Sequence, residues 1–245
     1  KQRYPDASDE SCKLRFHTQT GGSTLTAQQP DNNVVRVAYQ ALSAVLGGTQ
    51  SLHTNGKDEA LSLPTEENAR LALRTQQVIA FETGVADTVD PLAGSYFIED
   101  LTTKVYTEAL NLIDEIESRG GVLSCIEDGF IQKAISESSY QYQREVESKE
   151  KIVVGVNNFQ NSDKSTIKIH QLDPKVKERQ LQKLKAYKKN RDVVEVKQSL
   201  DNLKSKAKTK ENLIPAIISC LECKASLGEI SDSLREVFGV FRPKF

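Results

Sequence analysis

The chain has 245 residues, and its 33 Lys and Arg side chains are balanced by 34 Asp and Glu, which gives a formal net charge of -1. This balance gives no electrostatic support to a protein that binds nucleic acid or a membrane surface. Hydrophobic residues make up 38% of the chain, as in an ordinary globular domain, and no apolar run approaches the roughly 20 residues of a membrane span. We therefore expect neither nucleic acid nor a membrane among its partners.

The first part of the chain alternates strand-like and helical patterns. Residues 14–19 and 49–54 alternate with the period of a strand, and residues 152–156 form the aliphatic run typical of a strand buried on both faces. Helices are predicted from Asp31 to Gly47, from Thr65 to Gly84, before Gly120 and over residues 131–147. This order predicts an α/β fold with a parallel sheet. Because three parallel strands cannot close a barrel, we expect this half to belong to a larger structure whose other strands lie upstream.

The second part becomes Lys-rich and helical from about Ser165, so we divide the chain into domains at residues 1–165 and 166–245. The last helix is predicted over residues 227–238, with a Ser226/Glu229 capping box and a stop at Gly239. The lysines are interleaved with acidic residues, which favours a solvated helix face over a phosphate or nucleic-acid site.

Methionine is absent, so we expect the chain to be a piece of a longer polypeptide. Its four cysteines are too few and too unevenly spaced for a disulfide framework, which favours a reducing, cytoplasmic location. Cys220 and Cys223 form a C-x-x-C motif inside an apolar run. Since no second pair and no nearby histidine completes a zinc site, we favour two structural helix cysteines over a redox or metal role.

Strand alternation places polar side chains on one face of each of the first two strands. They are Arg15, His17 and Gln19 in the first strand, and Thr49, Ser51, His53 and Asn55 in the second. A barrel normally packs large aliphatic residues at such inward positions. Because an unpaired buried polar group costs on the order of 1 to 3 kcal/mol, we expect these groups to be satisfied by water or a ligand. An internal hydrogen-bond network without a ligand is the alternative.

The loop after the second strand, residues 55–59, is also polar and would lie at the ligand-binding end of a parallel sheet. Glu59 is suited to accept hydrogen bonds from ribose hydroxyls, but it is equally well explained as an exposed carboxylate at a helix start. The chain has no dinucleotide fingerprint, Walker loop, zinc-protease motif or hydrolase elbow. No nucleophile and base pair stands out.

Several longer sequence motifs resemble those of a known protein family. They are residues 14–26 (LRFHTQTGGSTLT), 31–36 (DNNVVR), 47–55 (GGTQSLHTN), 58–64 (DEALSLP), 90–96 (DPLAGSY) and 154–157 (VGVN). In this order they closely resemble the large (alpha) subunits of the methylmalonyl-CoA mutase family. The resemblance implies the C-terminal portion of a TIM (β/α)8 barrel threaded by coenzyme A, followed by a helical extension. It also implies an adenosylcobalamin-dependent radical isomerase that interconverts (R)-methylmalonyl-CoA and succinyl-CoA, in which the cofactor supplies the radical.

The resemblance also implies roles for individual residues. His17 and Gln19 match catalytic residues that line the reaction cavity, and Gln50 matches a residue that contacts the acyl-CoA substrate. The residues that match cofactor-binding positions are Gly22, Asn55, Glu59 and Ser62. Because Gln50 and His53 differ in strand parity, the role of Gln50 requires a bulge or a strand-end position.

The chain departs from the family in two respects. The upstream barrel half, which grips the substrate, is not in the sequence, so an isobutyryl-CoA or related mutase remains an alternative. The cobalt-binding word D-x-H-x-x-G is also missing, and His170 does not fit it. We therefore predict no metal ligand in this chain, a cobalamin-binding small subunit that docks at the helical extension, and no activity of the chain alone. A non-catalytic scaffold that keeps the fold is the alternative from another class.

Overall fold

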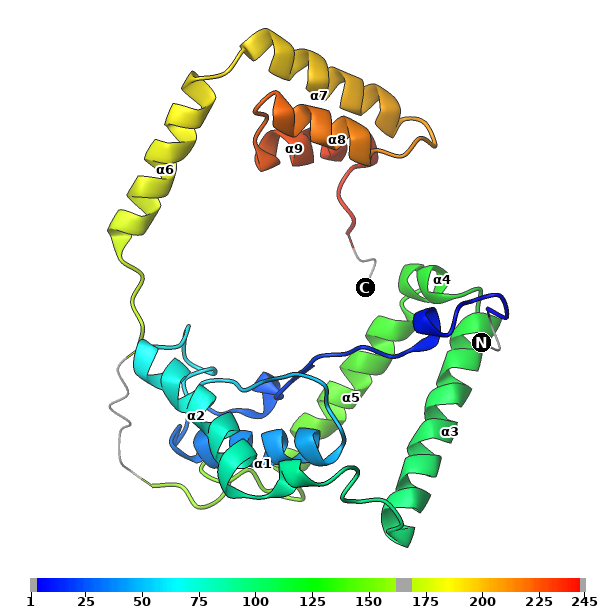
Figure 1. Ribbon diagram of the computed structural model, residues 1–245, viewed down its shortest axis with the longest axis vertical. Helices are drawn as coiled ribbons and strands as arrows, with labels where there is room; N and C mark the ends of the chain where they lie inside the picture. The colour runs from blue at the N-terminus through cyan, green and yellow to red at the C-terminus, as the bar shows by residue number, and fades with distance from the viewer. Residues whose placement is uncertain (1–3, 162–168, 243–245) are drawn as a thin grey trace. The chain divides into compact units, whose positions relative to one another are not determined.

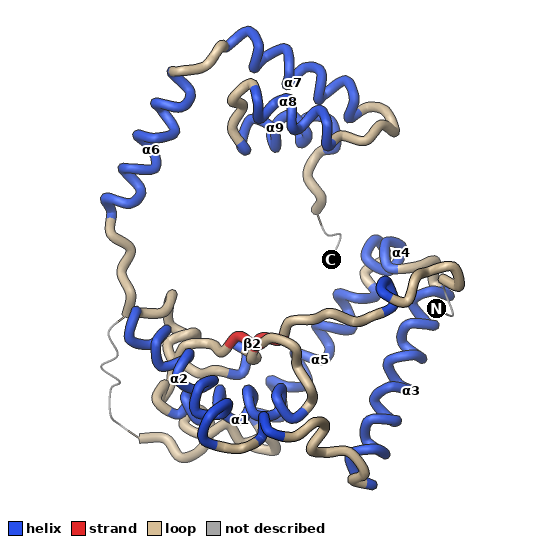
Figure 2. Tube along the Cα trace, viewed as in Figure 1, coloured by secondary structure: helices blue, strands red, loops and turns tan. Residues whose placement is uncertain are grey.

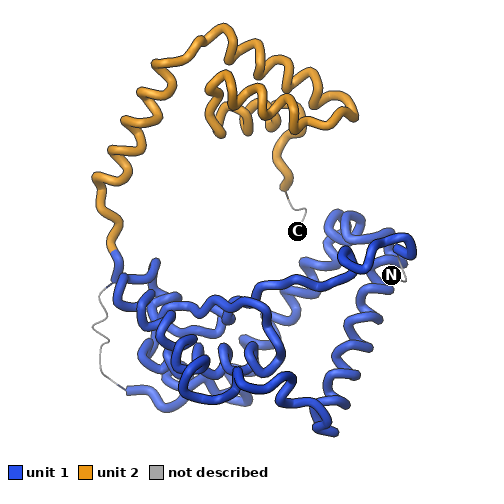
Figure 3. The backbone as a smooth tube through the Cα atoms, viewed as in Figure 1, with its two compact units in different colours: residues 1–170 blue, residues 171–245 orange. Residues whose placement is uncertain are grey.

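The computed structural model describes residues 4–161 and 169–242. The chain forms two compact units, residues 1–170 and 171–245 (Figure 3). The composition change predicted at Ser165 lies outside the described residues. The assignment of residues 1–165 and 166–245 to two functional domains therefore stays a prediction.

A small parallel sheet lies at the centre of the first unit. Strand β1 (Thr18–Gln19) pairs with β2 (Leu52–His53), with Thr18 opposite Leu52 and Gln19 opposite His53. Helix α1 (Asn32–Leu46) connects the two strands (Figures 1 and 2). The predicted strand–helix–strand order and the parallel pairing are confirmed, although both strands are shorter than the sequence pattern indicates. The first unit is therefore mostly helical with a small parallel sheet, which is consistent with the predicted α/β class.

The predicted strand over residues 152–156 is wrong. Val154 makes only an isolated bridge to Asn158, and the amide N of Gly155 donates to the carbonyl of Asn158 across a tight turn. Gly155 has φ of 80° at this turn, and Asn157 Oδ1 accepts a hydrogen bond from the amide N of Val153. Val154 is 44% exposed, so the segment is not buried on both faces. The aliphatic run indicates a buried strand, but Gly155 and Asn157 stabilise a turn in its place.

Helices α1 and α2 (Glu66–Glu82) pack together next to the sheet. Thr65 caps α2 as predicted, since its hydroxyl accepts a hydrogen bond from the amide N of Asn68 at 3.3 Å. The face of α1 that packs inward carries one polar side chain and two aliphatic ones. Asn33, Val37 and Ala41 are buried, whereas Val35 is 55% exposed.

The remaining helices of this unit are two long, exposed ones and a short one between them. They are α3 (Tyr96–Ser118), α4 (Val122–Glu127) and α5 (Phe130–Glu147), with 3-10 turns η1 (Glu10–Cys12), η2 (Gly22–Thr24) and η3 (Val85–Asp87) elsewhere in the unit. Neither α3 nor α5 contains a buried residue. Large apolar side chains of α3 are left exposed, among them Phe97, Val105, Tyr106 and Leu112.

The second unit contains a helical module with its own core. Its helices are α6 (Pro174–Lys189), α7 (Val193–Ala207), α8 (Ile214–Glu222) and α9 (Leu227–Phe238). The core lies between α7, α8 and α9 and consists of Val196, Leu203, Ala216, Cys220, Ala225 and Ile230. Burial raises the pKa of the Cys220 thiol, which agrees with a structural helix cysteine. The predicted last helix and its Ser226/Glu229 capping box are confirmed.

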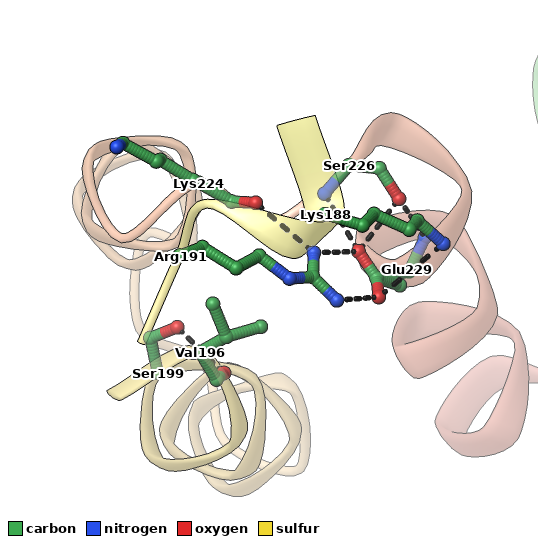
Figure 4. Close-up of polar contacts among 7 residues, drawn as sticks. All are labelled: Lys188, Arg191, Val196, Ser199, Lys224, Ser226 and Glu229. Atoms are coloured by element: carbon green, nitrogen blue, oxygen red, sulfur yellow. Dashed lines mark hydrogen bonds and ion pairs between the residues drawn. The ribbon is translucent and has the colours of Figure 1, made fainter. Parts of the chain in front are cut away.

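An ion pair joins the segment before α7 to the start of α9 (Figure 4). The guanidinium of Arg191 donates two hydrogen bonds to the Glu229 carboxylate, at 2.7 and 2.5 Å, and a third to the carbonyl of Lys224. Lys188 Nζ, at the end of α6, lies 3.5 Å from the same carboxylate. The Arg191 hydrogen bonds hold the pKa of Glu229 well below its ordinary range.

None of the helices within residues 4–161 and 169–242 has the length and the apolar composition of a membrane span.

Candidate functional site

The polar faces of the two strands meet at two places, as the alternation predicts, whereas Thr49 turns to the other face and donates its hydroxyl to Thr18 Oγ1 at 2.6 Å. His17 Nδ1 lies 2.7 Å from Ser51 Oγ, and Gln19 Nε2 donates to Asn55 Oδ1 at 3.0 Å. Both His17 and Gln19 are exposed. Thr54, which has the opposite parity to Asn55, donates its hydroxyl to the carbonyl of Ala72 in α2. The His17 and Gln19 face therefore points away from α2, and we call these side chains with Ser51 and Asn55 the polar wall.

A second group of predicted residues meets where β1 and β2 end. Gly22 lies so close to Asn55 and Glu59 that a Cβ atom at residue 22 would stand 2.8 Å from Asn55 Nδ2 and 3.2 Å from Glu59 Oε1. The first distance is shorter than real Cβ contacts and the second is unusually tight, so a side chain at residue 22 would force Asn55 and Glu59 to shift. The structure thus brings together three of the residues predicted to bind the cofactor.

Asn55 and Glu59 differ in how far they reach out of this group. Asn55 is 2% exposed, and its Nδ2 donates to the carbonyl of Thr20 at 3.1 Å while its Oδ1 accepts from Gln19. The Glu59 carboxylate is exposed and accepts no hydrogen bond from the described residues. Asn55 therefore fixes Gln19, and Glu59 presents two free acceptor oxygens beside Gly22.

Gln50 and Ser62 lie apart from these contacts. Gln50 Oε1 accepts from the amide N of Phe16 at 2.9 Å, and Gln50 Nε2 donates to the carbonyl of Leu14 at 3.2 Å. This side chain thus continues the pairing of the two strand segments beyond β1. Ser62 is half-buried and donates its hydroxyl to the carbonyl of Leu63. Their predicted substrate and cofactor roles stay predictions.

The sequence reasoning missed the buried polar residues that hold the site in place. Asn33 of α1 is 0% exposed, and its Nδ2 donates to the carbonyls of Thr26 and Lys57, both at 2.9 Å. Asp58 is also 0% exposed and contacts the start of α2. Strand alternation could not reveal them, because one is in a helix and the other in a loop. An Asn in the first turn of an apolar helix was the only available signal.

Metal-ligating side chains do not gather at the site. In the part of the chain that the structure describes, no group of three or more His, Cys, Asp or Glu side chains is placed to hold a metal ion. The site instead offers exposed amide, imidazole, hydroxyl and carboxylate groups. Such groups bind and orient a ligand through hydrogen bonds.

In α/β proteins with parallel strands, ligands commonly bind at the carboxyl ends of the strands. The polar groups described above lie at and after these ends of β1 and β2. The comparisons with known proteins give the family. The family model described as methylmalonyl-CoA mutase matches residues 1–240, and the chain belongs to this family.

Individual relatives agree with this assignment. The 2-hydroxyisobutanoyl-CoA mutase large subunit of Aquincola tertiaricarbonis is 44% identical over 99% of this chain and 43% of its own length. The methylmalonyl-CoA mutase of Rhizobium meliloti is 42% identical over 97% of this chain and 34% of its own length. The human mitochondrial methylmalonyl-CoA mutase is 39% identical over 98% and 32%. The chain therefore spans less than half the length of these relatives.

Proposed function

We propose that the chain is the C-terminal part of the acyl-CoA-binding TIM barrel in an adenosylcobalamin-dependent acyl-CoA mutase. The observation that carries this proposal is the polar wall, whose His17 and Gln19 side chains are exposed on the face that points away from α2. In a barrel whose helices lie outside, this face would look toward the axis. The remaining barrel strands would come from the part of the protein that the chain does not span.

The reaction we propose is the interconversion of (R)-methylmalonyl-CoA and succinyl-CoA. Two of the relatives above are named methylmalonyl-CoA mutase, which supports this substrate pair. The relative with 44% identity is named for a hydroxylated, branched acyl-CoA, which favours a related branched acyl-CoA as the second candidate. Gln50, beside the backbone of Leu14 and Phe16, would contact the coenzyme A part of either substrate.

The residues around Gly22 suit the adenosyl part of a cofactor. The missing side chain at residue 22 lets Asn55 and Glu59 lie against its backbone, a group that we call the cradle, and the free Glu59 oxygens suit the hydroxyl groups of an adenosyl ribose. We propose that Gly22, Asn55, Glu59 and Ser62 hold the cofactor on this side, with the cobalt ligand supplied by a cobalamin-binding small subunit docked at residues 166–245. When bound, the cofactor supplies the radical that starts the rearrangement.

The chain's own groups would bind and orient the reactants rather than transfer protons. The contact with Ser51 fixes the His17 ring, whose Nε2 remains free for a hydrogen bond to substrate. Asn55 fixes the Gln19 amide and leaves its Oε1 and one N–H free. Groups fixed in this way would orient the substrate through hydrogen bonds and help to keep mobile water away from the reacting atoms.

The direct test uses the full-length large subunit together with its small partner subunit. We expect adenosylcobalamin to change the corrin absorption spectrum on binding, and the complex to isomerise a methylmalonyl- or branched acyl-CoA ester. An unchanged spectrum together with no isomerisation of any of these esters would refute the proposal. Activity with a branched ester alone would select the second candidate.

The cradle can be tested with one added methyl group. Gly22→Ala places a Cβ 2.8 Å from Asn55 Nδ2, so we expect the affinity for adenosylcobalamin to fall at least about tenfold, equivalent to about 1.4 kcal/mol. Gly21→Ala is the matched control, because a Cβ there meets nothing closer than 3.8 Å. Equal affinities of the two variants would contradict the cradle.

A further inference from the structure

Asp58 is a buried carboxylate without a cationic partner among the described residues. Its exposed fraction is 0%, and the neighbouring cation, Lys57, pairs with Asp31 instead, at 2.7 Å. One of its oxygens, Oδ2, accepts from Asn68 Nδ2 at 2.6 Å and from the amide N of Thr65 at 3.1 Å. The other, Oδ1, is buried and accepts no hydrogen bond from the residues that the structure describes. A buried charge of this kind is costly, so its retention calls for a physical reason.

The start of α2 provides the compensation for this charge. Thr65 is the N-cap of α2 and Asn68 lies in its first turn, so both donors to Asp58 belong to the positive end of a 17-residue helix. Asp58 therefore fastens the loop to α2 by charge-assisted hydrogen bonds, which are shorter and stronger than neutral ones.

The rest of the loop is arranged around this fastening. The backbone carbonyl of Asp58 accepts from the amide N atoms of Leu61 and Ser62, at 2.8 and 3.0 Å. A Cβ at Gly56 would stand 2.6 Å from Asp58 Oδ1, so glycine makes room for the carboxylate. On the other side, Asn33 of α1 holds the carbonyl of Lys57. Glu59, which follows Asp58 directly, thus has a backbone fixed from both sides.

We propose that Asp58 is a positioning residue that holds the Glu59 carboxylate against Gly22 for the ligand of the cradle. This inference rests on the proposed function, because it takes the adenosyl ribose as that ligand. Asp58 itself touches no ligand, since its side chain is buried on the α2 side of the loop while Glu59 is exposed. The buried carboxylate sets where the exposed one lies.

The test measures the affinity of the full-length large subunit, with its partner subunit, for two cobalamins. Asp58→Asn removes the charge and replaces one carboxylate oxygen with an NH2 group, so it should weaken adenosylcobalamin binding by about ten- to a hundredfold. Binding of methylcobalamin, which has a methyl group in place of the adenosyl group and its ribose, should change by less than about threefold. Asp31→Asn is the matched control, because Asp31 is an exposed aspartate next to the same loop, and we expect it to change neither affinity.

A second variant separates positioning from a general loss of folding. The exchange Asp58→Asn with Asn68→Asp restores one amide–carboxylate pair at the start of α2, and we expect it to recover most of the lost adenosylcobalamin affinity. Amide hydrogen exchange of residues 55–62 without any cobalamin should speed up in Asp58→Asn and slow down again in the exchange variant. Because a general loss of folding would speed exchange in every segment, the loop is loosened specifically only if residues 32–46 keep their wild-type exchange rate.

The outcomes distinguish this inference from the proposed function. If the wild-type complex binds neither cobalamin, the proposed function fails and the ligand role of Asp58 fails with it. If the wild type binds both and Asp58→Asn binds adenosylcobalamin equally well, only the positioning role is overturned. Equal losses for adenosylcobalamin and methylcobalamin, without recovery in the exchange variant, would also overturn it, because they indicate a structural role.

Discussion

Helices α7–α9 and the two long helices α3 and α5 are all amphipathic, but only the first group buries its apolar face within the described residues. Leu203 of α7 is 0% exposed among the core residues of its module, whereas Leu112 of α3 is 52% exposed. The same residue type at the same kind of helix position thus has opposite surroundings. The comparison shows that a hydrophobic period predicts which face of a helix seeks burial, but not what covers it.

Leu203→Ala should produce the largest loss of stability. It removes a fully buried side chain from the core of α7–α9, and we expect the free energy of unfolding to fall by about 3 kcal/mol. Amide hydrogen exchange across residues 193–238 of the chain measures this loss. Leu221→Ala, at a position that is 51% exposed on α8, is the control and should cost less than about 1 kcal/mol. Similar losses in both variants would mean that the module has no core of its own.

Glu229→Gln should have the next largest effect, because it breaks the paired hydrogen bonds to Arg191. We expect a loss of about 2 kcal/mol at pH 7. The pKa of Glu229 is lowered in the folded state, first by the Arg191 hydrogen bonds, so the stabilisation is complete above the ordinary value of 4.5 and declines as pH falls toward the folded pKa. Urea unfolding should therefore show the gap between wild type and variant narrowing below about pH 4.5.

The pair of Lys204 with Glu236 offers a control for that measurement. Lys204 Nζ lies 2.6 Å from Glu236 Oε2, but the Glu236 side chain is 63% exposed. Because solvent screens such a pair, Glu236→Gln should cost no more than about 0.5 kcal/mol. If it costs as much as Glu229→Gln, burial does not explain the strength of the Arg191 pair.

Leu112→Ala should have the smallest effect in this chain and a larger one in the full-length protein. In the chain the side chain is half exposed, so we expect a change within about 0.5 kcal/mol. If the rest of the protein covers α3, the same substitution there should cost about 2 kcal/mol or more. Thermal unfolding of both forms measures the difference. An equally small effect in both would show that this face of α3 stays exposed.

Much of the local structure was predictable from short sequence signals. The helix caps at Thr65 and Ser226 and the stop at Gly239 follow from side-chain hydrogen bonds and backbone freedom over a few residues. The alternation in residues 14–19 and 49–54 also predicted that His17 and Gln19 would share a face with Ser51 and Asn55. The wrong strand prediction at residues 152–156 shows the limit of local signals, because an aliphatic run does not reveal whether a neighbouring strand is available for pairing.

Three residues of the candidate site were predictable, whereas the residues that support them were not. Gly22, Asn55 and Glu59 lie together as the resemblance implies. Asn33 and Asp58 were not found, because their burial depends on contacts with Lys57 and Asn68 that no local period encodes.

The sequence by itself determined the helices, their caps, the parity of the strand residues and the family. The first three follow from local hydrogen bonding and backbone geometry, and the family follows from the order of the sequence motifs. Only the tertiary structure decided that Asp58 points into α2 while Glu59 points out beside Gly22. The physical reason is that burying a charge becomes acceptable only where distant donors, here at the start of α2, are brought to meet it.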